Sequence, residues 1–138
     1  MFLVVSLFHN LKVMKKLTKA EEQIMQVLWE LEKGFVNDIV SILSDPKPAY
    51  NTVSTIVRIL EQKGFIAHKA YGRTHEYYPL VQKEDYSREY LNNFTQNYFS
   101  NSNKALASFF ANTENLSIKE LEEIKVLVDE QIKNHKKT

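Results

Sequence analysis

Apolar residues recur every three or four positions through the first third of the chain, a spacing that predicts amphipathic helices. The first predicted helix opens at a capping box, Thr18 to Glu21, in which the hydroxyl and the carboxylate can each accept a backbone amide of the first turn. We expect Gly34 to end it, because glycine readily adopts the left-handed conformation that closes many helices. Asn37 is expected to cap a second helix, which the prolines within residues 45–48 stop.

A third helix is predicted from about Tyr50 to Lys63, followed by a β-hairpin. Four apolar residues at helical spacing form its inward face: Val53, Ile56, Val57 and Leu60. Two short extended runs, 65–69 and 74–79, flank a turn around Gly72 and predict the two strands of the hairpin.

The rest of the chain is predicted to be helical. Aromatic residues repeat at every fourth position, namely Tyr86, Tyr90, Phe94 and Tyr98. The Asn/Ser-rich stretch 100–103 breaks this helix, and a short apolar segment with Phe109 and Phe110 follows. A second capping box, Ser117 to Glu120, opens a final helix that ends in a solvated tail, residues 133–138.

Three helices followed by a two-stranded hairpin is the element order of a winged helix-turn-helix. The predicted fold class is therefore mainly α with a small β-hairpin, a winged helix-turn-helix followed by a helical dimerisation region. We expect an N-terminal extension at residues 1–13, a winged-helix DNA-binding domain at 14–82 and a helical dimerisation region at 83–138.

The side chains of the third helix and the hairpin suit DNA binding. In this fold the third helix enters the major groove, where short polar side chains can reach base edges and an arginine one turn further can reach a base or a phosphate. Cationic residues on the hairpin can meet phosphates or the minor groove. The predicted DNA-binding residues are Asn51, Thr52, Ser54, Thr55 and Arg58 on the helix, and Lys69 and Arg73 on the hairpin.

The apolar stripes of the second half need a surface to pack against. They can form a core against the winged domain, or a second copy of the chain can cover them, since a two-fold interface buries the same stripe twice. We predict a homodimer whose interface includes Tyr90, Phe94, Tyr98, Leu121, Ile124 and Val128. A heterodimer and an unpaired surface helix are the alternatives.

Composition and charge narrow the possible functions. The chain has 138 residues and no cysteine, which excludes disulfides, thiolate zinc sites, iron–sulfur clusters and a cysteine nucleophile. Residues 1–82 hold 10 basic and 8 acidic residues, whereas residues 83–138 hold 8 and 9. This asymmetry has the sign expected for DNA binding, but it is small. We therefore expect modest nonspecific affinity, with specificity supplied by the third helix and by dimerisation.

The sequence offers no catalytic arrangement. Its four histidines are scattered, no paired-carboxylate spacing occurs, and no glycine-rich phosphate loop is present. His68 and His75 can face each other across the hairpin, but a structural zinc site usually has four ligands, so we expect them to be hairpin surface. We predict that the protein is not an enzyme and uses no metal or other cofactor.

Residues 1–13 differ in character from the rest. Their apolar run is far shorter than the roughly 20 residues of a membrane span, and it lacks the preceding positive charge of a secretory signal. An upstream in-frame extension and an ordinary packed extension explain the segment equally well. We expect a cytoplasmic protein without membrane association.

Three segments resemble the penicillinase-repressor family (the BlaI/MecI type of winged-helix transcriptional repressor). Residues 17–29 resemble its opening helix, residues 52–64 its operator-reading helix, and Gly72-Arg73 with Tyr77-Tyr78-Pro79 its wing and outgoing strand. The resemblance implies a dimeric repressor that binds a palindromic operator, with intertwined C-terminal helices. It matches Thr52, Ser54, Thr55 and Arg58 to positions of the operator-reading helix, and Arg73 to the wing.

The resemblance also implies routes of induction. In the resistance-gene members a sensor-linked protease leads to cleavage at an Asn-Phe pair in the dimerisation region. The matching position here reads Phe109-Phe110, so these residues are the candidate cleavage site although the pair differs. The copper-responsive relatives use a C-terminal cysteine cluster, which this chain lacks.

Two further interpretations remain open. Winged helices also serve as protein-interaction modules that bind no specific DNA, and a winged-helix sensor can bind a small ligand in an aromatic cleft. An Arg58→Ala change that leaves the biological role intact favours the first of these. Stabilisation by a ligand without proteolysis favours the second.

Overall fold

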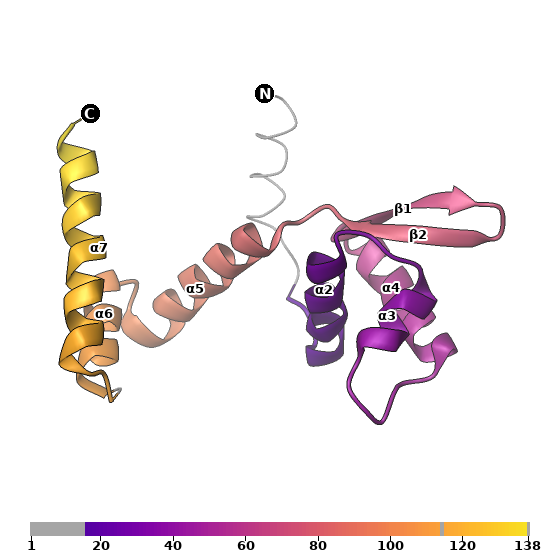
Figure 1. Cartoon of the computed structure of the whole chain (residues 1–138), viewed down its shortest axis with the longest axis horizontal. Coiled ribbons are helices and arrows are strands. Elements are labelled where there is room, and N and C mark those ends of the chain that lie inside the picture. The colour runs from indigo at the N-terminus through magenta and orange to yellow at the C-terminus, as the bar shows by residue number, and fades with distance from the viewer. Residues whose placement is uncertain (1–15, 114, 138) are drawn as a thin grey trace. The chain divides into compact units, whose positions relative to one another are not determined.

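The computed structural model describes residues 16–113 and 115–137, so the expectations for residues 1–13 lie outside the described residues. Its elements, labelled as in Figure 1, are α2 (Lys19–Leu31), α3 (Val36–Ile42), α4 (Tyr50–Gln62), β1 (Ile66–Tyr71), β2 (Thr74–Pro79), α5 (Lys83–Phe99), α6 (Asn103–Thr113) and α7 (Ile118–Lys136). The predicted fold class, helical with one antiparallel hairpin, is confirmed. The chain forms two compact units that divide between Leu91 and Asn92. The boundary between a DNA-binding domain ending at residue 82 and a dimerisation region starting at residue 83 stays a prediction.

The first unit, described from residue 16 to Leu91 and called the winged unit, has a hydrophobic core to which α2, α3, α4 and the hairpin all contribute. Its fully buried side chains are Met25, Leu28, Ile39, Val53, Val57, Leu60, Phe65 and Ile66. The inward face predicted for the third helix is confirmed, with Val53, Val57 and Leu60 fully buried and Ile56 half-buried. In Figure 1 the hairpin extends past the ends of α3 and α4 as a wing.

The start of α2 is as predicted, but its end is not. Thr18 and Glu21 form the capping box, with hydrogen bonds of 2.8 and 3.2 Å. The helix stops at Leu31, and Glu32 rather than Gly34 takes the positive φ (70°) that follows the helix end. Gly34 instead pairs with Tyr77 through two backbone hydrogen bonds, which add a short edge to the hairpin. A side chain at Gly34 would crowd Leu31, because a Cβ atom would lie 3.2 Å from its Cδ1.

The cap predicted for the second helix is also wrong. Phe35 is the N-cap of α3, and Asn37 lies within the first turn. The amide of Phe35 donates to the Asp38 carboxylate at 2.9 Å, which is the bond from the third helical residue back to the N-cap, and Phe35 itself offers no capping side chain. At the other end, the Lys47 ammonium donates to the carbonyl oxygens of residues 41 and 43 at 2.9 and 2.8 Å.

A buried ion pair joins the start of α2 to the end of α4. The Lys63 ammonium lies 2.8 Å from Glu21 Oε1, and the Glu21 side chain is 5% exposed. Burial acts to raise the pKa of the Glu21 carboxyl, but the hydrogen bonds from Lys63 and Thr18 outweigh it, so this pKa is lowered. The pair therefore stabilises the charged form of Glu21 in the folded state.

We expect Glu21→Gln to lower the free energy of unfolding at neutral pH by about 1–3 kcal/mol, because the Lys63 ammonium loses its charged partner. A lowered folded-state pKa gives stability that is present above the unfolded pKa and is lost as pH falls through the folded one. The difference between variant and wild type should therefore shrink in acid. Urea unfolding at several pH values measures it, and a difference that stays constant into acid contradicts the assignment.

The first turn of α5 belongs to the winged unit. The Tyr86 ring lies 5.7 Å from the Trp29 ring and 5.9 Å from the Phe65 ring, and its hydroxyl donates to Glu22 at 3.0 Å. The Trp29 indole donates to the carbonyl of Val81 at 2.8 Å. Tyr86 is half-buried and packs against the core, whereas Tyr90, Phe94 and Tyr98 of the aromatic stripe are exposed.

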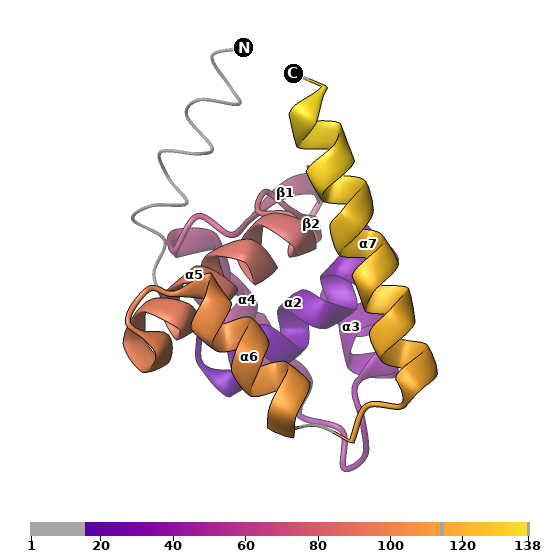
Figure 2. The same ribbon diagram turned by 90° about the vertical axis from the view of Figure 1, so that its left-hand side faces the viewer.

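The C-terminal unit, residues 92–113 and 115–137, leaves most of its large apolar side chains exposed. The second capping box, Ser117 with Glu120, is confirmed, and α7 continues to Lys136, so most of the expected tail is helical. Lys133, His135 and Lys136 occupy its last turn, where cations interact well with the helix dipole. The described residues of α6 and α7 include no buried side chain. Figure 2 shows α6 and α7 as two distinct helices.

No described helix is long and apolar enough to cross a membrane.

Candidate nucleic-acid interface

One face of α4 is turned to solvent and carries most of the predicted DNA-binding side chains. The exposed residues of this face are Asn51, Thr52, Thr55, Arg58, Ile59 and Gln62. The opposite face is anchored by three fully buried residues, so the helix cannot rotate without exposing core. The polar face is consequently held outward by the packing of the apolar one.

Ser54 does not belong to this outward face, and the expectation that it is exposed is wrong. Only 8% of the residue is exposed, and its hydroxyl accepts a hydrogen bond from Arg58 Nη2 at 3.2 Å. Ser54 lies one helical turn from both Tyr50 and Arg58, on the side of α4 that faces the hairpin. It therefore orients the Arg58 guanidinium toward the wing.

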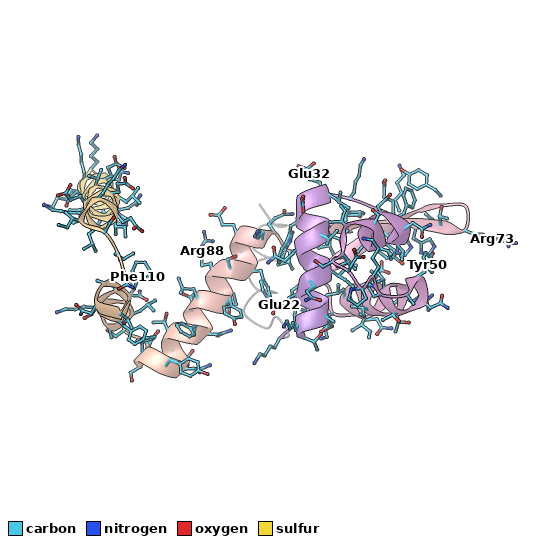
Figure 3. All side chains as sticks on the ribbon, turned by 60° about the horizontal axis from the view of Figure 1, so that its bottom comes forward. Glu22, Glu32, Tyr50, Arg73, Arg88 and Phe110 are labelled. Carbon is cyan, nitrogen blue, oxygen red and sulfur yellow. The ribbon has the colours of Figure 1, made fainter. Side chains whose placement is uncertain are left out.

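A cleft of about 500 Å³ lies between α4, the start of α3 and the wing. It is lined by Phe35, Val36, Asn37, Asp38, Tyr50, Ser54, Arg58, Arg73, Thr74, His75 and Tyr77. Two of these residues, Arg58 and Arg73, bring positive charge to it from different elements. Figure 3 shows Tyr50 on the side of the winged unit that carries the hairpin and Arg73 at the hairpin tip. The cleft thus lies between α4 and the hairpin, the two elements that the sequence predicts to bind DNA.

The wing presents its cations at its far end. Gly72 takes a positive φ of 63° in the turn, which exposes Arg73 next to it. The Lys69 ammonium lies 5.3 Å from the centre of the Tyr71 ring, a cation–π contact that restrains the lysine. Both predicted wing residues are therefore exposed beside the turn.

The two wing histidines form a stack, as their places in the hairpin suggested. Their rings lie 4.1 Å apart and nearly parallel, and His68 Nδ1 is 2.5 Å from Glu61 Oε2. Within the described ranges, no group of three or more acidic or histidine side chains is arranged to hold a metal ion. The stack ties the base of the wing to the end of α4.

The residues predicted for dimerisation are mostly exposed in the single chain. The exposed fractions are 57% for Tyr90, 38% for Phe94, 74% for Tyr98, 40% for Leu121 and 53% for Val128, and Ile124 is half-buried. An apolar groove runs along α7, lined by Ile124, Leu127, Val128, Gln131, Ile132, His135 and Lys136. The candidate cleavage residues Phe109 and Phe110 lie within α6, 55% and 45% exposed.

Among the residues of the site that sequence reasoning missed are Tyr50 and Ile59. Tyr50 lines the cleft as the first residue of α4, and Ile59 is 39% exposed on the outward face. A signal for Ile59 was present in the sequence, because it falls outside the apolar positions 53, 56, 57 and 60 of the helix. Nothing in the sequence indicated that Tyr50 faces the wing, since that depends on how the hairpin packs.

Comparison with known proteins agrees with this architecture. The family model described as "Penicillinase repressor" matches residues 17–130. The methicillin resistance regulatory protein MecI of Staphylococcus aureus (strain N315) is 26% identical over 117 residues, which cover 84% of this chain and 95% of the relative. The penicillinase repressor of Bacillus licheniformis is 25% identical over 128 residues, which cover 92% and 99%.

A solved structure shares the fold across both units. The complex structure of hsRosR-S4 covers 91% of this chain and 97% of its own, with a TM-score of 0.53 and 17% identity, which shows a likeness of fold alone. The family match spans well over half of the chain, and it agrees with the predicted winged helix and with the resemblance of the three segments. The chain belongs to the penicillinase repressor family.

Proposed function

We propose that this protein is a homodimeric transcriptional repressor whose winged unit binds a palindromic operator. One observation carries the proposal: the reading face of α4 is held outward beside a cleft that collects Arg58 and Arg73, in a chain of a repressor family. Residues 14–82 then bind DNA and residues 83–138 form the dimer. The place of action is the cytoplasm, where bacterial operators lie.

The outward face of α4 has the chemistry of a major-groove reader. An α-helix fits this groove, and amide or hydroxyl side chains can bond base edges there. Asn51 and Thr52 lie at the N-terminal end of α4, the end that usually contacts bases in helix-turn-helix proteins. Lys69 and Arg73 on the wing are placed to contact phosphates beyond the helix, and Ser54 acts only through Arg58.

Arg58 is proposed to bind a phosphate rather than a base. Its guanidinium is drawn toward the wing by Ser54, and it lines the cleft between the helix and the wing. With α4 in the major groove and the wing at the adjacent minor groove, the DNA strand between the two grooves passes between α4 and the wing. A cation there meets the strand's backbone.

We expect Arg58→Met to weaken binding about 10-fold at physiological salt, nearly equally for operators that differ by one base pair. The slope of log affinity against log salt concentration should fall in magnitude by about 0.9 per half-site, since one phosphate contact is lost. Fluorescence anisotropy over a salt series measures both quantities. Arg88→Met is the matched control, because Arg88 pairs with Glu84 and Asp85 on α5. Loss of discrimination at a single base pair, with an unchanged slope, contradicts the phosphate role.

The C-terminal helices support the dimer. Six large apolar residues of α7 are exposed, namely Ile118, Leu121, Val126, Leu127, Val128 and Ile132, and such a concentration of exposed apolar side chains is typical of an interaction surface. The groove of α7 is lined by four apolar side chains, Ile124, Leu127, Val128 and Ile132, and a second copy of the same helix offers a surface of the same kind. Two winged units joined in this way bind two half-sites about one or more turns of DNA apart.

Release of the operator by a sensor-linked protease is the proposed route of induction. The candidate bond, between Phe109 and Phe110, lies inside α6, and a protease must unwind that turn before it can cut. Mass spectrometry of the protein from induced cells checks this. An intact chain after induction contradicts cleavage.

The function is tested by selecting bound duplexes from a random DNA pool with the full chain, and by measuring its mass in solution. Enrichment of a dyad-symmetric site by a dimer supports the repressor. Failure to enrich any sequence overturns it and favours a protein-interaction module.

A further inference from the structure

Two apolar groups sit side by side in the middle of the outward face of α4. Thr55 and Ile59 are four residues apart, so they are neighbours on the helix surface. The Thr55 hydroxyl donates to the carbonyl of Asn51 at 2.9 Å, which turns the oxygen toward the backbone. The methyl group of Thr55 is then the part of the side chain that faces outward, next to the exposed Ile59.

This pair has polar neighbours on the same strip of the helix. Asn51 lies one turn before it and Gln62 follows within a turn, and both are exposed. A single exposed isoleucine needs no explanation. An isoleucine paired with an outward threonine methyl, on the face proposed to enter the major groove, provides a small apolar surface between two amides. Both side chains are β-branched, so they hold their methyl groups in few rotamers.

The major groove contains one apolar group, the C5-methyl of thymine. We propose that Thr55 and Ile59 read thymine methyl groups, so that each operator half-site carries thymine at the base pairs opposite this pair. The inference rests on the proposed function and adds a base preference to it. A protein partner needs a larger apolar core than these two side chains provide.

The test uses the operator obtained by selection, with each thymine in turn replaced by deoxyuridine, which removes only the methyl group. For the wild-type chain we expect one or two such replacements per half-site to weaken binding about 3- to 10-fold each, the effect of uncovering one methyl contact. Ile59→Ala should bind less tightly and become insensitive to one of these replacements. Thr55→Ser keeps the hydroxyl and loses the methyl, and it should become insensitive to the other.

The matched control is Ile42→Ala, which truncates an isoleucine of similar exposure (42%) on α3. It should leave the deoxyuridine effects unchanged, and thermal melting confirms that all variants fold. If every deoxyuridine operator binds the wild type as tightly as the parent does, or if the sensitivity persists in both α4 variants, the inference is wrong while the repressor stands. If selection enriches no DNA, the proposed function itself fails.

Discussion

Replacing Ile124 and Val128 together by glutamate is expected to turn the dimer into monomers and to lower affinity for the full operator by about 100-fold or more. Both side chains line the apolar groove of α7, where a partner helix would bury the new carboxylates beside each other. A monomer binds one half-site and loses the gain that comes from holding two reading helices on one molecule.

Sedimentation equilibrium and titration with full and half operators measure this result. Val126→Glu is the matched control, since Val126 is an exposed valine (54%) on the same helix that does not line the groove. It should remain a dimer. Half-site affinity should be similar for all three proteins. A double variant that still sediments as a dimer contradicts the proposed interface.

Phe65→Ala is expected to lower the free energy of unfolding of the winged unit by about 3–5 kcal/mol. Phe65 is 1% exposed, its ring packs against Tyr86, and it follows directly on the turn that ends α4. Its carbonyl accepts the amide of Leu80 at 2.8 Å, so the residue joins the reading helix, the wing and the start of α5. The loss is a large part of the roughly 5–15 kcal/mol that holds a typical domain folded.

Urea unfolding followed by circular dichroism measures the change. Phe110→Ala removes a phenylalanine that is 45% exposed in α6, and it should shift the stability of the winged unit by less than about 0.5 kcal/mol. Equal effects of the two substitutions on the free energy of unfolding contradict the prediction that burial of Phe65 stabilises the winged unit. DNA binding by the Phe65 variant should fall only as its folded fraction falls.

Local chemistry explains which parts of the fold were predictable. The capping boxes at Thr18 and Ser117 depend on residues three positions apart, and the structure confirms both. The ends of the helices were harder to predict. Gly34 was expected to close α2, but pairing with Tyr77, more than forty residues away, holds it as an edge of the hairpin.

In the candidate site, too, the local pattern was predictable and the long-range contacts were not. Helical periodicity separates the buried Val53, Val57 and Leu60 from the exposed Asn51 and Thr55. It does not tell which flank of the helix the wing covers. The sequence therefore placed Ser54 with the outward residues, although it is buried beside Arg58.

The sequence alone determined the order of the elements, the inward face of the reading helix and the family resemblance, because these depend on residue types at short, regular spacing. Only the tertiary structure decided that Arg58 turns toward the wing and that one cleft is lined by both Arg58 and Arg73. It also decided that the Thr55 methyl group faces outward beside Ile59. These features depend on how the hairpin packs against α4 and on where single hydrogen bonds direct side chains. Such contacts join residues that are distant in the chain, or they depend on the rotamer of one side chain. The spacing of residue types along the sequence predicts neither.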